Sequence, residues 1–205
     1  MNNIQRICVF SGSNPGNHTD YEAAALRLGE VLAARGIDLV YGGASVGLMG
    51  RVADKVLSMG RKAIGVMPTG LFRGEIAHTG LTEFHEVGSM HERKKLMADL
   101  SDAFISMPGG LGTYEELFEA ACWSQIGIHQ KPIGLLNVRG FYDPLIAMLE
   151  HTIREGFMRE ENLGLLVVES DPELLVERLL HYVPVKQGQK WVELTSECCA
   201  VDREL

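Results

Sequence analysis

Short apolar segments alternate with longer amphipathic segments along most of this sequence. Residues 7–10 form an apolar run of strand length, and in the following residues 21–35 the apolar side chains recur at helical spacing. Such alternation is typical of parallel strands, because each parallel strand needs a crossover connection, usually a helix, before the next begins. The pattern predicts an α/β fold: a single doubly wound, Rossmann-like domain, with a mostly parallel sheet and helices on both faces.

The same reading places the individual elements. Strands are predicted at 7–10, 37–41, 63–67, 84–87, 103–107, 133–137 and 165–168, and helices at 21–35, 48–59, 90–100, 113–126, 144–155 and 172–182. Residues 69–82 form a polar, irregular stretch, and the chain turns polar again from Lys186. We therefore expect one domain over residues 1–185 and a loosely held polar tail over residues 186–205.

Composition excludes several classes of function. The formal net charge of −8 argues against a nucleic-acid partner, because a groove for the phosphate backbone needs clustered Lys and Arg. The four cysteines, Cys8, Cys122, Cys198 and Cys199, have the spacing of neither a metal site nor a disulfide framework. No apolar run approaches the ~18 residues of a membrane span, and the first residues lack the apolar region of a signal peptide. We expect a soluble, cytoplasmic protein without a membrane partner.

Small residues gather at the ends of three predicted strands, at residues 11–13, 42–45 and 108–110. In doubly wound sheets, ligands bind beyond the carboxyl ends of the strands, where the strand order reverses. Glycine permits close approach of the backbone, and the free N–H groups at a helix start attract anions. One such turn is weak evidence, since strand-to-helix turns need glycine anyway. Three at one edge favour a phosphate or nucleotide site, with Ser11, Gly12 and Gly43 among its residues.

The known nucleotide fingerprints are not met. Residues 42–47 have the wrong glycine spacing for a dinucleotide site, and no lysine of a phosphate-binding loop follows Gly112 and Thr113. NAD and ATP chemistry are therefore unsupported, and no cofactor is predicted. His91 and Glu92 lack companions at metal-ligand spacing, so no metal site is predicted either.

Two groups of charged residues lie near the expected site. Glu115 and Glu116 fall in the first turn of the predicted helix 113–126, where carboxylates complement the helix dipole. The helix dipole accounts for one of the two carboxylates, and we interpret the other as pointing into the ligand-binding cleft expected at the strand ends. Arg93, Lys94 and Lys95 open another predicted helix, where positive charge opposes the dipole. An anionic partner for Arg93 would offset that cost.

Two longer motifs carry a resemblance to a known family. Pro-Gly-Gly-Leu-Gly-Thr-Tyr-Glu-Glu at residues 108–116 resembles the Pro-Gly-Gly-x-Gly-Thr-x-x-Glu signature of the LOG ("lonely guy") family, and Met-His-Glu-Arg-Lys at residues 90–94 resembles its second motif. Shorter matches lie at 41–43, 47–50, 65–68 and 123–129, so that the resemblance covers residues 7–177. Members of this family are cytokinin riboside 5′-monophosphate phosphoribohydrolases, often labelled lysine decarboxylases.

The resemblance implies a hydrolase that cleaves the N-glycosidic bond of an (N6-prenyl)adenosine 5′-monophosphate, works without a metal, and assembles as a homodimer. By motif, Arg93 and Glu116 correspond to the catalytic pair. The residues that correspond to substrate contacts are Glu75, Lys94, Gly109, Gly110, Leu111, Gly112, Thr113, Tyr114 and Glu115.

Two positions depart from the family's pattern. Ala44 stands where a third glycine is common, and Ala-Ala-Cys at residues 120–122 replaces a Val-Ile-Thr segment, which removes a hydroxyl there.

The implied chemistry fits the residue types. Breaking a glycosidic C–N bond builds positive charge on the ribose, which a carboxylate stabilises. The same carboxylate could activate water or form a covalent intermediate. We favour Glu116 as stabiliser and base, with Arg93 holding phosphate or ribose oxygens or assisting the leaving base.

Alternative functions are a general AMP nucleosidase and a nucleotide carrier or sensor without turnover. A pyridoxal-phosphate decarboxylase is disfavoured, because no lysine lies in a recognisable context for a Schiff base.

Overall fold

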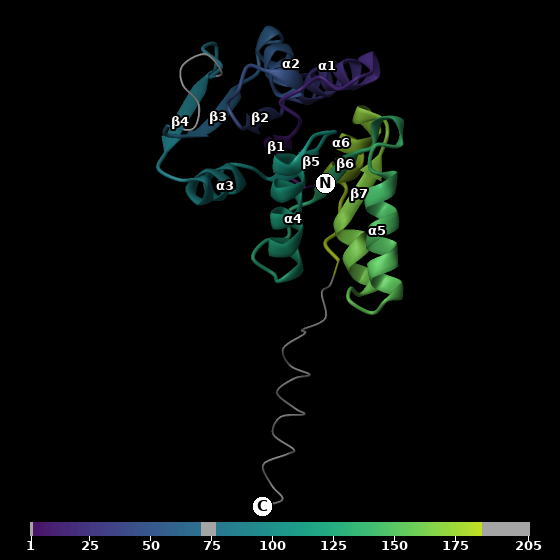
Figure 1. Cartoon of the computed structure of the whole chain (residues 1–205). Coiled ribbons are helices and arrows are strands. Elements are labelled where there is room, and N and C mark those ends of the chain that lie inside the picture. Colours follow the sequence, from purple (N-terminus) through teal and green to yellow (C-terminus); the bar gives the residue numbers. More distant parts are fainter. Residues whose placement is uncertain (1, 71–76, 186–205) are drawn as a thin grey trace, which may run out of the picture.

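The computed structural model of the chain describes residues 2–70 and 77–185, which build one seven-stranded sheet with helices on both sides (Figure 1). The strands are β1 (Arg6–Phe10), β2 (Asp38–Tyr41), β3 (Ala63–Pro68), β4 (Glu83–Val87), β5 (Ala103–Ser106), β6 (Ile133–Leu136) and β7 (Leu166–Glu169). The α-helices are α1 (Thr19–Ala34), α2 (Gly47–Ser58), α3 (Met90–Asp99), α4 (Leu111–Gln125), α5 (Asp143–Arg154) and α6 (Pro172–Leu180).

Successive side chains of a strand point to opposite faces of the sheet and contribute to two separate hydrophobic cores. On β1, Ile7 and Val9 belong to one cluster and Cys8 and Phe10 to the other, as the two-residue period of a strand requires. Helices α1, α2 and α6 cover the first cluster, while α3, α4 and α5 cover the second. Because both faces are covered, successive residues of the central strands are buried, rather than alternating between buried and exposed.

All strand pairs are parallel, in the order β4-β3-β2-β1-β5-β6-β7. The chain moves outward from β1 to β4 and then returns through α3 to place β5 on the other side of β1. The order therefore reverses between β1 and β5, and the turns that follow these two strands lie at the reversal. This is the point at which doubly wound sheets bind ligands.

The predicted fold class is confirmed, and each predicted strand and α-helix is present. Helix α4 begins at Leu111, two residues before the prediction, because Gly110 rather than Gly112 is the N-cap residue. Two short 3-10 helices, η1 (Val138–Gly140) and η2 (Glu160–Leu165), were not predicted, since segments this short carry no measurable periodicity. The predicted tail from residue 186 lies outside the described residues.

Candidate active site

The turns after β1 and β5 lie against one another. The N–H of Gly12 donates to the carbonyl of Pro108 at 3.0 Å, and a Cβ on Gly12 would lie 3.2 Å from the Cα of Gly109. A Cβ on Gly109 would lie 2.9 Å from the Gly12 nitrogen and would overlap the Thr113 side chain. Gly109 is therefore required for the close approach of the two turns, and a side chain on Gly12 would be tightly packed there, independently of any ligand.

Packing does not require glycine at Gly110 or Gly112. A Cβ on Gly110 or Gly112 would meet nothing within 4 Å, and neither residue has a positive φ. Gly110 is the N-cap of α4, no side chain caps the helix there, and Leu111 beside it is 88% exposed. Because the first N–H groups of a helix have no partner within the helix, this open end offers donors to an anion.

Ser11 lies beside this open helix start, at the end of β1. The residue is 7% exposed, and its hydroxyl is buried without a hydrogen-bond partner in the part of the chain that the structure describes. A buried hydroxyl without a partner is costly, so a ligand that supplied one would gain from the contact.

An ion pair joins α3 to α4 on the side of the sheet that carries the second core. One guanidinium nitrogen of Arg93 donates to Oε1 of Glu116 at 2.8 Å, while its Nε donates to the carbonyl of Val66 on β3 at 3.1 Å. Both side chains are nearly buried, at 13% and 11% exposed. A second guanidinium nitrogen occupies the space where Gly42, after β2, would carry a Cβ. The guanidinium is therefore held by three elements.

Burial dominates the electrostatics of Glu116. It raises the pKa of the carboxyl above its ordinary value, and the adjacent Arg93 opposes this rise by charge and by hydrogen bond. Neighbouring Glu115 adds to the rise, while Lys94 opposes it. A carboxyl whose pKa is raised binds a proton more readily than an ordinary glutamate, which favours a role in proton transfer.

Lys94 makes a second link between the helices. Its ammonium contacts carboxylate oxygens of both Glu115 and Glu119, the latter at 3.0 Å. Burial would lower the pKa of Lys94, but the hydrogen bonds to these two carboxylates raise it above its ordinary value. The Lys94 side chain is only 9% exposed, and both of its ion-pair partners lie on α4.

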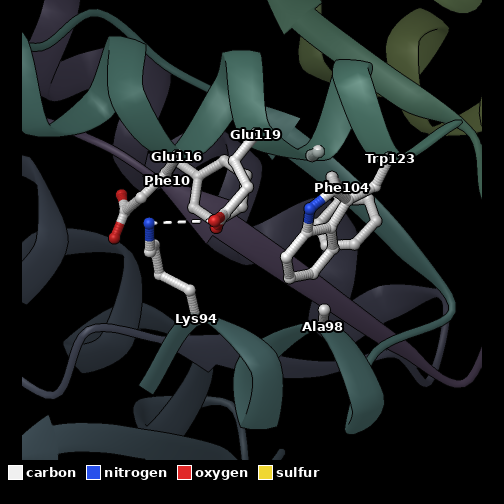
Figure 2. A pocket seen from close by; sticks show the side chains of 8 residues that line it. Phe10, Lys94, Ala98, Phe104, Glu116, Glu119 and Trp123 are labelled. Atoms are coloured by element: carbon white, nitrogen blue, oxygen red, sulfur yellow. Dashed lines mark ion pairs between the residues drawn. The ribbon is translucent and has the colours of Figure 1, made fainter. Parts of the chain in front are cut away.

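A small pocket opens beside these charges, between α3 and α4 (Figure 2). Aromatic side chains of Phe10, Phe104 and Trp123 and the small side chains of Ala98 and Ala120 form its apolar walls, with an empty volume of about 250 Å³ that includes space open to solvent. Figure 2 shows Lys94 and Glu119 meeting at one side, next to Glu116. The pocket therefore joins an apolar surface to the charged cluster.

Comparison with known proteins identifies the family. A family described as "Possible lysine decarboxylase" matches residues 49–179. The chain is 50% identical over 182 residues to the probable cytokinin riboside 5′-monophosphate phosphoribohydrolase LOGL9 of Oryza sativa subsp. japonica, covering 89% of this chain and 80% of the relative. It is 47% identical over 181 residues to the cytokinin riboside 5′-monophosphate phosphoribohydrolase LOG1 of Arabidopsis thaliana, covering 88% and 85%. The chain belongs to the LOG family.

Solved structures agree with the fold. A molybdenum cofactor binding protein from Rippkaea orientalis superimposes with a TM-score of 0.64 at 24% identity, over 84% of this chain and 93% of the other. The molybdenum cofactor carrier protein of Chlamydomonas reinhardtii gives 0.65 at 23% identity, over 86% and 98%. At this identity the likeness shows a shared fold and nothing about the ligand of this LOG-family chain.

The structure brings most of the predicted site residues of this LOG-family chain together. Arg93 and Glu116 are in contact, and Lys94 and Glu115 lie beside them. Thr113 is buried, with its side chain against Gly109. Gly43 is buried and has a φ of +81°, so glycine is needed there for the backbone alone. The ring of Tyr114 stacks on Phe141. Glu75 lies outside the described residues.

One expectation was wrong. Glu115 and Glu116 do not lie in the first turn of their helix, because α4 begins at Leu111 and its first turn holds no acidic residue. Complementing the helix dipole therefore explains neither carboxylate, since that effect fades beyond the first turn. Their ion pairs with Arg93 and Lys94 are the stronger explanation.

Sequence reasoning missed Glu119. Its position three residues after Glu116 and four after Glu115 puts it on the same side of α4, and this spacing was the available signal. The carbonyl of Val66 was also missed, and no side-chain pattern could have revealed it.

No helix of residues 2–70 and 77–185 is long and apolar enough to cross a membrane. Nor do these residues contain a group of three or more His, Cys, Asp or Glu side chains that could hold a metal ion.

Proposed function

We propose that this LOG-family chain hydrolyses the N-glycosidic bond of cytokinin riboside 5′-monophosphates, releasing the free base and ribose 5-phosphate. The names of relatives at 45–50% identity support the reaction class. The observation that carries the proposal is the nearly buried Arg93–Glu116 pair, which lies beside an uncapped helix start at the reversal of strand order. A carboxylate next to an anion site is what cleavage of a nucleotide's glycosidic bond requires.

The start of α4 is proposed to bind the 5′-phosphate. Gly110 and Gly112 face open space, so that an anion can reach the backbone N–H groups of the first turn. The positive end of the helix dipole adds to this attraction. Ser11 would supply its hydroxyl to the ribose phosphate, and Gly12 lets the turn after β1 lie close to it.

Glu116 is proposed to act at the ribose carbon C1′. As the C1′–N bond breaks, its electron pair leaves with the base and positive charge builds on the ribose, which the carboxylate stabilises. The oxygen of a water molecule then bonds to C1′, and Glu116 accepts the proton that this water loses. That proton passes to the departing base, which restores the carboxylate. The raised pKa of Glu116 supports proton exchange in this role.

Arg93 is proposed to keep Glu116 ionised and aligned, and to hold a ribose or phosphate oxygen. Its guanidinium is fixed by Val66 and Glu116 at the same time, so it is preorganised before substrate binds. Lys94 and the residues from Gly109 to Glu115 remain proposed substrate contacts. For Lys94 this requires release from at least one of its carboxylate partners.

We also propose the homodimer that the family resemblance implies. Three strongly exposed apolar side chains lie at the two ends of α4: Leu111 at its start, and Ile126 and Ile128 just beyond its end. Exposed apolar residues at both ends of the helix that carries Glu116 support an interface that includes α4. Light scattering coupled to size-exclusion chromatography measures the mass; a monomer of 22.6 kDa at micromolar concentration would contradict this proposal.

Product chromatography tests the function. The protein is incubated with AMP and, separately, with isopentenyladenosine monophosphate, and the free base is quantified. We expect base release from at least one nucleotide, and the ratio of rates gives the preference between a general AMP nucleosidase and a cytokinin-forming enzyme. Tight nucleotide binding with no base released would instead support a carrier.

The variant Glu116→Gln examines the assigned role. It keeps the size of the side chain and a hydrogen-bond acceptor for Arg93, but it cannot become a carboxylate. We expect retained AMP binding, measured by calorimetry, and a loss of base release of at least about a hundredfold, the typical scale of general acid–base catalysis. Turnover near that of the wild type would rule Glu116 out as the catalytic carboxylate.

A further inference from the structure

Three ion pairs join α3 to α4, and they form two adjacent links. Arg93 pairs with Glu116, and the next residue of α3, Lys94, pairs with Glu115 and Glu119. Glu115 and Glu119 are one helical turn apart, with Glu116 between them in the sequence. The Lys94 ammonium therefore bridges two points of α4. Figure 2 shows its pair with Glu119 beside Glu116, the proposed catalytic carboxylate.

Packing between α3 and α4 is incomplete next to the Lys94 bridge. Ala98 on α3 and Ala120 on α4 line the pocket with small side chains, which leave part of the space between the helices empty. A well-packed interface would fix the distance between the helices through the core. Here the charged bridge supplies part of that constraint.

We propose that Glu119 is a positioning residue of this active site: with Glu115 it holds Lys94, and this bridge sets α3 against α4 at the spacing at which Arg93 meets Glu116. This inference rests on the function proposed above. It assigns Glu119 no contact with substrate. The Lys94–Glu119 contact is the more sheltered arm of the bridge, because the Glu119 side chain is 23% exposed and that of Glu115 is 52% exposed. Water therefore screens the Glu119 arm less.

The direction in which the pKa of Glu116 shifts separates a positioning role of Glu119 from a simple charge effect. The charged and titratable groups around Glu116 come from three elements: Arg93 and Lys94 from α3, Glu115 and Glu119 from α4, and Cys8 from β1. The Cys8 thiol stays neutral, because burial raises its pKa. In the variant Glu119→Gln, removing a nearby negative charge would by itself lower the pKa of Glu116. Loosening the Arg93–Glu116 pair would raise it, because Arg93 holds the pKa down. The two explanations predict opposite shifts.

The experiment measures base release by Glu119→Gln as a function of pH and of nucleotide concentration. We expect kcat to fall on the order of tenfold, the scale of a small misplacement of reacting groups, with KM within about twofold of the wild type. We expect the acid limb of the kcat profile to move to higher pH. Asp99→Asn is the matched control: it breaks the exposed Lys95–Asp99 pair on α3, away from α4, and should leave kcat, KM and the acid limb unchanged.

Other outcomes overturn the inference. An acid limb that moves to lower pH, or does not move, means that Glu119 acts only through its charge or only on stability. A rise in KM at constant kcat means that Glu119 contributes to substrate binding rather than to the positioning of Glu116. A wild-type protein that releases no base contradicts the proposed function instead. In that case, titration of the Glu116 carboxyl by carbon NMR in wild type and Glu119→Gln still tests the positioning role, because the sign of the pKa shift needs no substrate.

Discussion

The variant Gly42→Ala perturbs the Arg93–Glu116 pair without changing either residue. Gly42 follows β2, and the added methyl group would overlap a guanidinium nitrogen of Arg93. The backbone at Gly42 does not have a positive φ, so alanine is conformationally acceptable there and the side-chain overlap is the main effect. The guanidinium must move by about 1 Å to restore an ordinary contact.

The distance between Arg93 and Glu116 sets the expected loss of attraction and of rate in Gly42→Ala. The Arg93–Glu116 contact is 2.8 Å. At an effective dielectric constant of about 20, lengthening such a contact to about 3.8 Å weakens the attraction from about 6 to about 4.4 kcal/mol, a loss of roughly 1.5 kcal/mol. This is about tenfold in rate if the pair acts in the transition state. Because Arg93 holds the pKa of Glu116 down, a weaker pair raises that pKa, and the acid limb of kcat should move to higher pH.

The assay follows base release across pH, with thermal unfolding recorded in parallel. Ala44→Gly is the matched control, because it changes the same turn without adding an atom. The reasoning is refuted if Gly42→Ala keeps the wild-type kcat and acid limb while remaining folded. It is also refuted if the control loses activity to the same extent, since the turn rather than the guanidinium would then be responsible.

Substitutions at three further positions test the scaffold through chemical or thermal unfolding. Gly109→Ala forces the turn after β5 away from that after β1, and should lower the free energy of unfolding by about 1–3 kcal/mol, as overpacking does. Tyr142→Phe removes a buried hydroxyl that donates to the Met107 carbonyl at 2.6 Å, at a cost of about 1–3 kcal/mol. Arg139 has a φ of 56°, so Arg139→Val should cost about 1–3 kcal/mol, whereas Arg139→Asn should be tolerated. Equal stability of the two Arg139 variants would contradict this account.

Much of the fold was predictable because its signal is local. Each buried strand is a short apolar run and each helix has a repeating apolar face, so their order along the chain can be read from spacing alone. The start of α4 was misplaced by two residues, since a row of glycines does not indicate which one is the N-cap. That error placed Glu115 and Glu116 in the first turn and made the helix dipole look like a sufficient explanation for one of them.

The candidate site was only partly predictable because its contacts are distant in sequence. Arg93 and Glu116 were named from motifs, but their contact depends on α3 and α4 covering the same face of the sheet. Glu119 was missed: its spacing from Glu115 and Glu116 places it on the same side of α4, but it does not show that a lysine from another helix lies opposite. The requirement for glycine at position 42 is likewise invisible in sequence, since it arises from a guanidinium 51 residues away along the chain.

The sequence by itself therefore determined the α/β class, the nearly complete set of elements, and the glycine turns that can receive an anion. These follow from backbone geometry and from the periodic burial of side chains, which are properties of neighbouring residues. Only the tertiary structure decided which turns meet, that Gly110 and Gly112 face open space, and that Glu116 is nearly buried against Arg93. Those features depend on how separate elements pack, and the raised pKa of Glu116 depends on that packing in turn, because burial is its main cause.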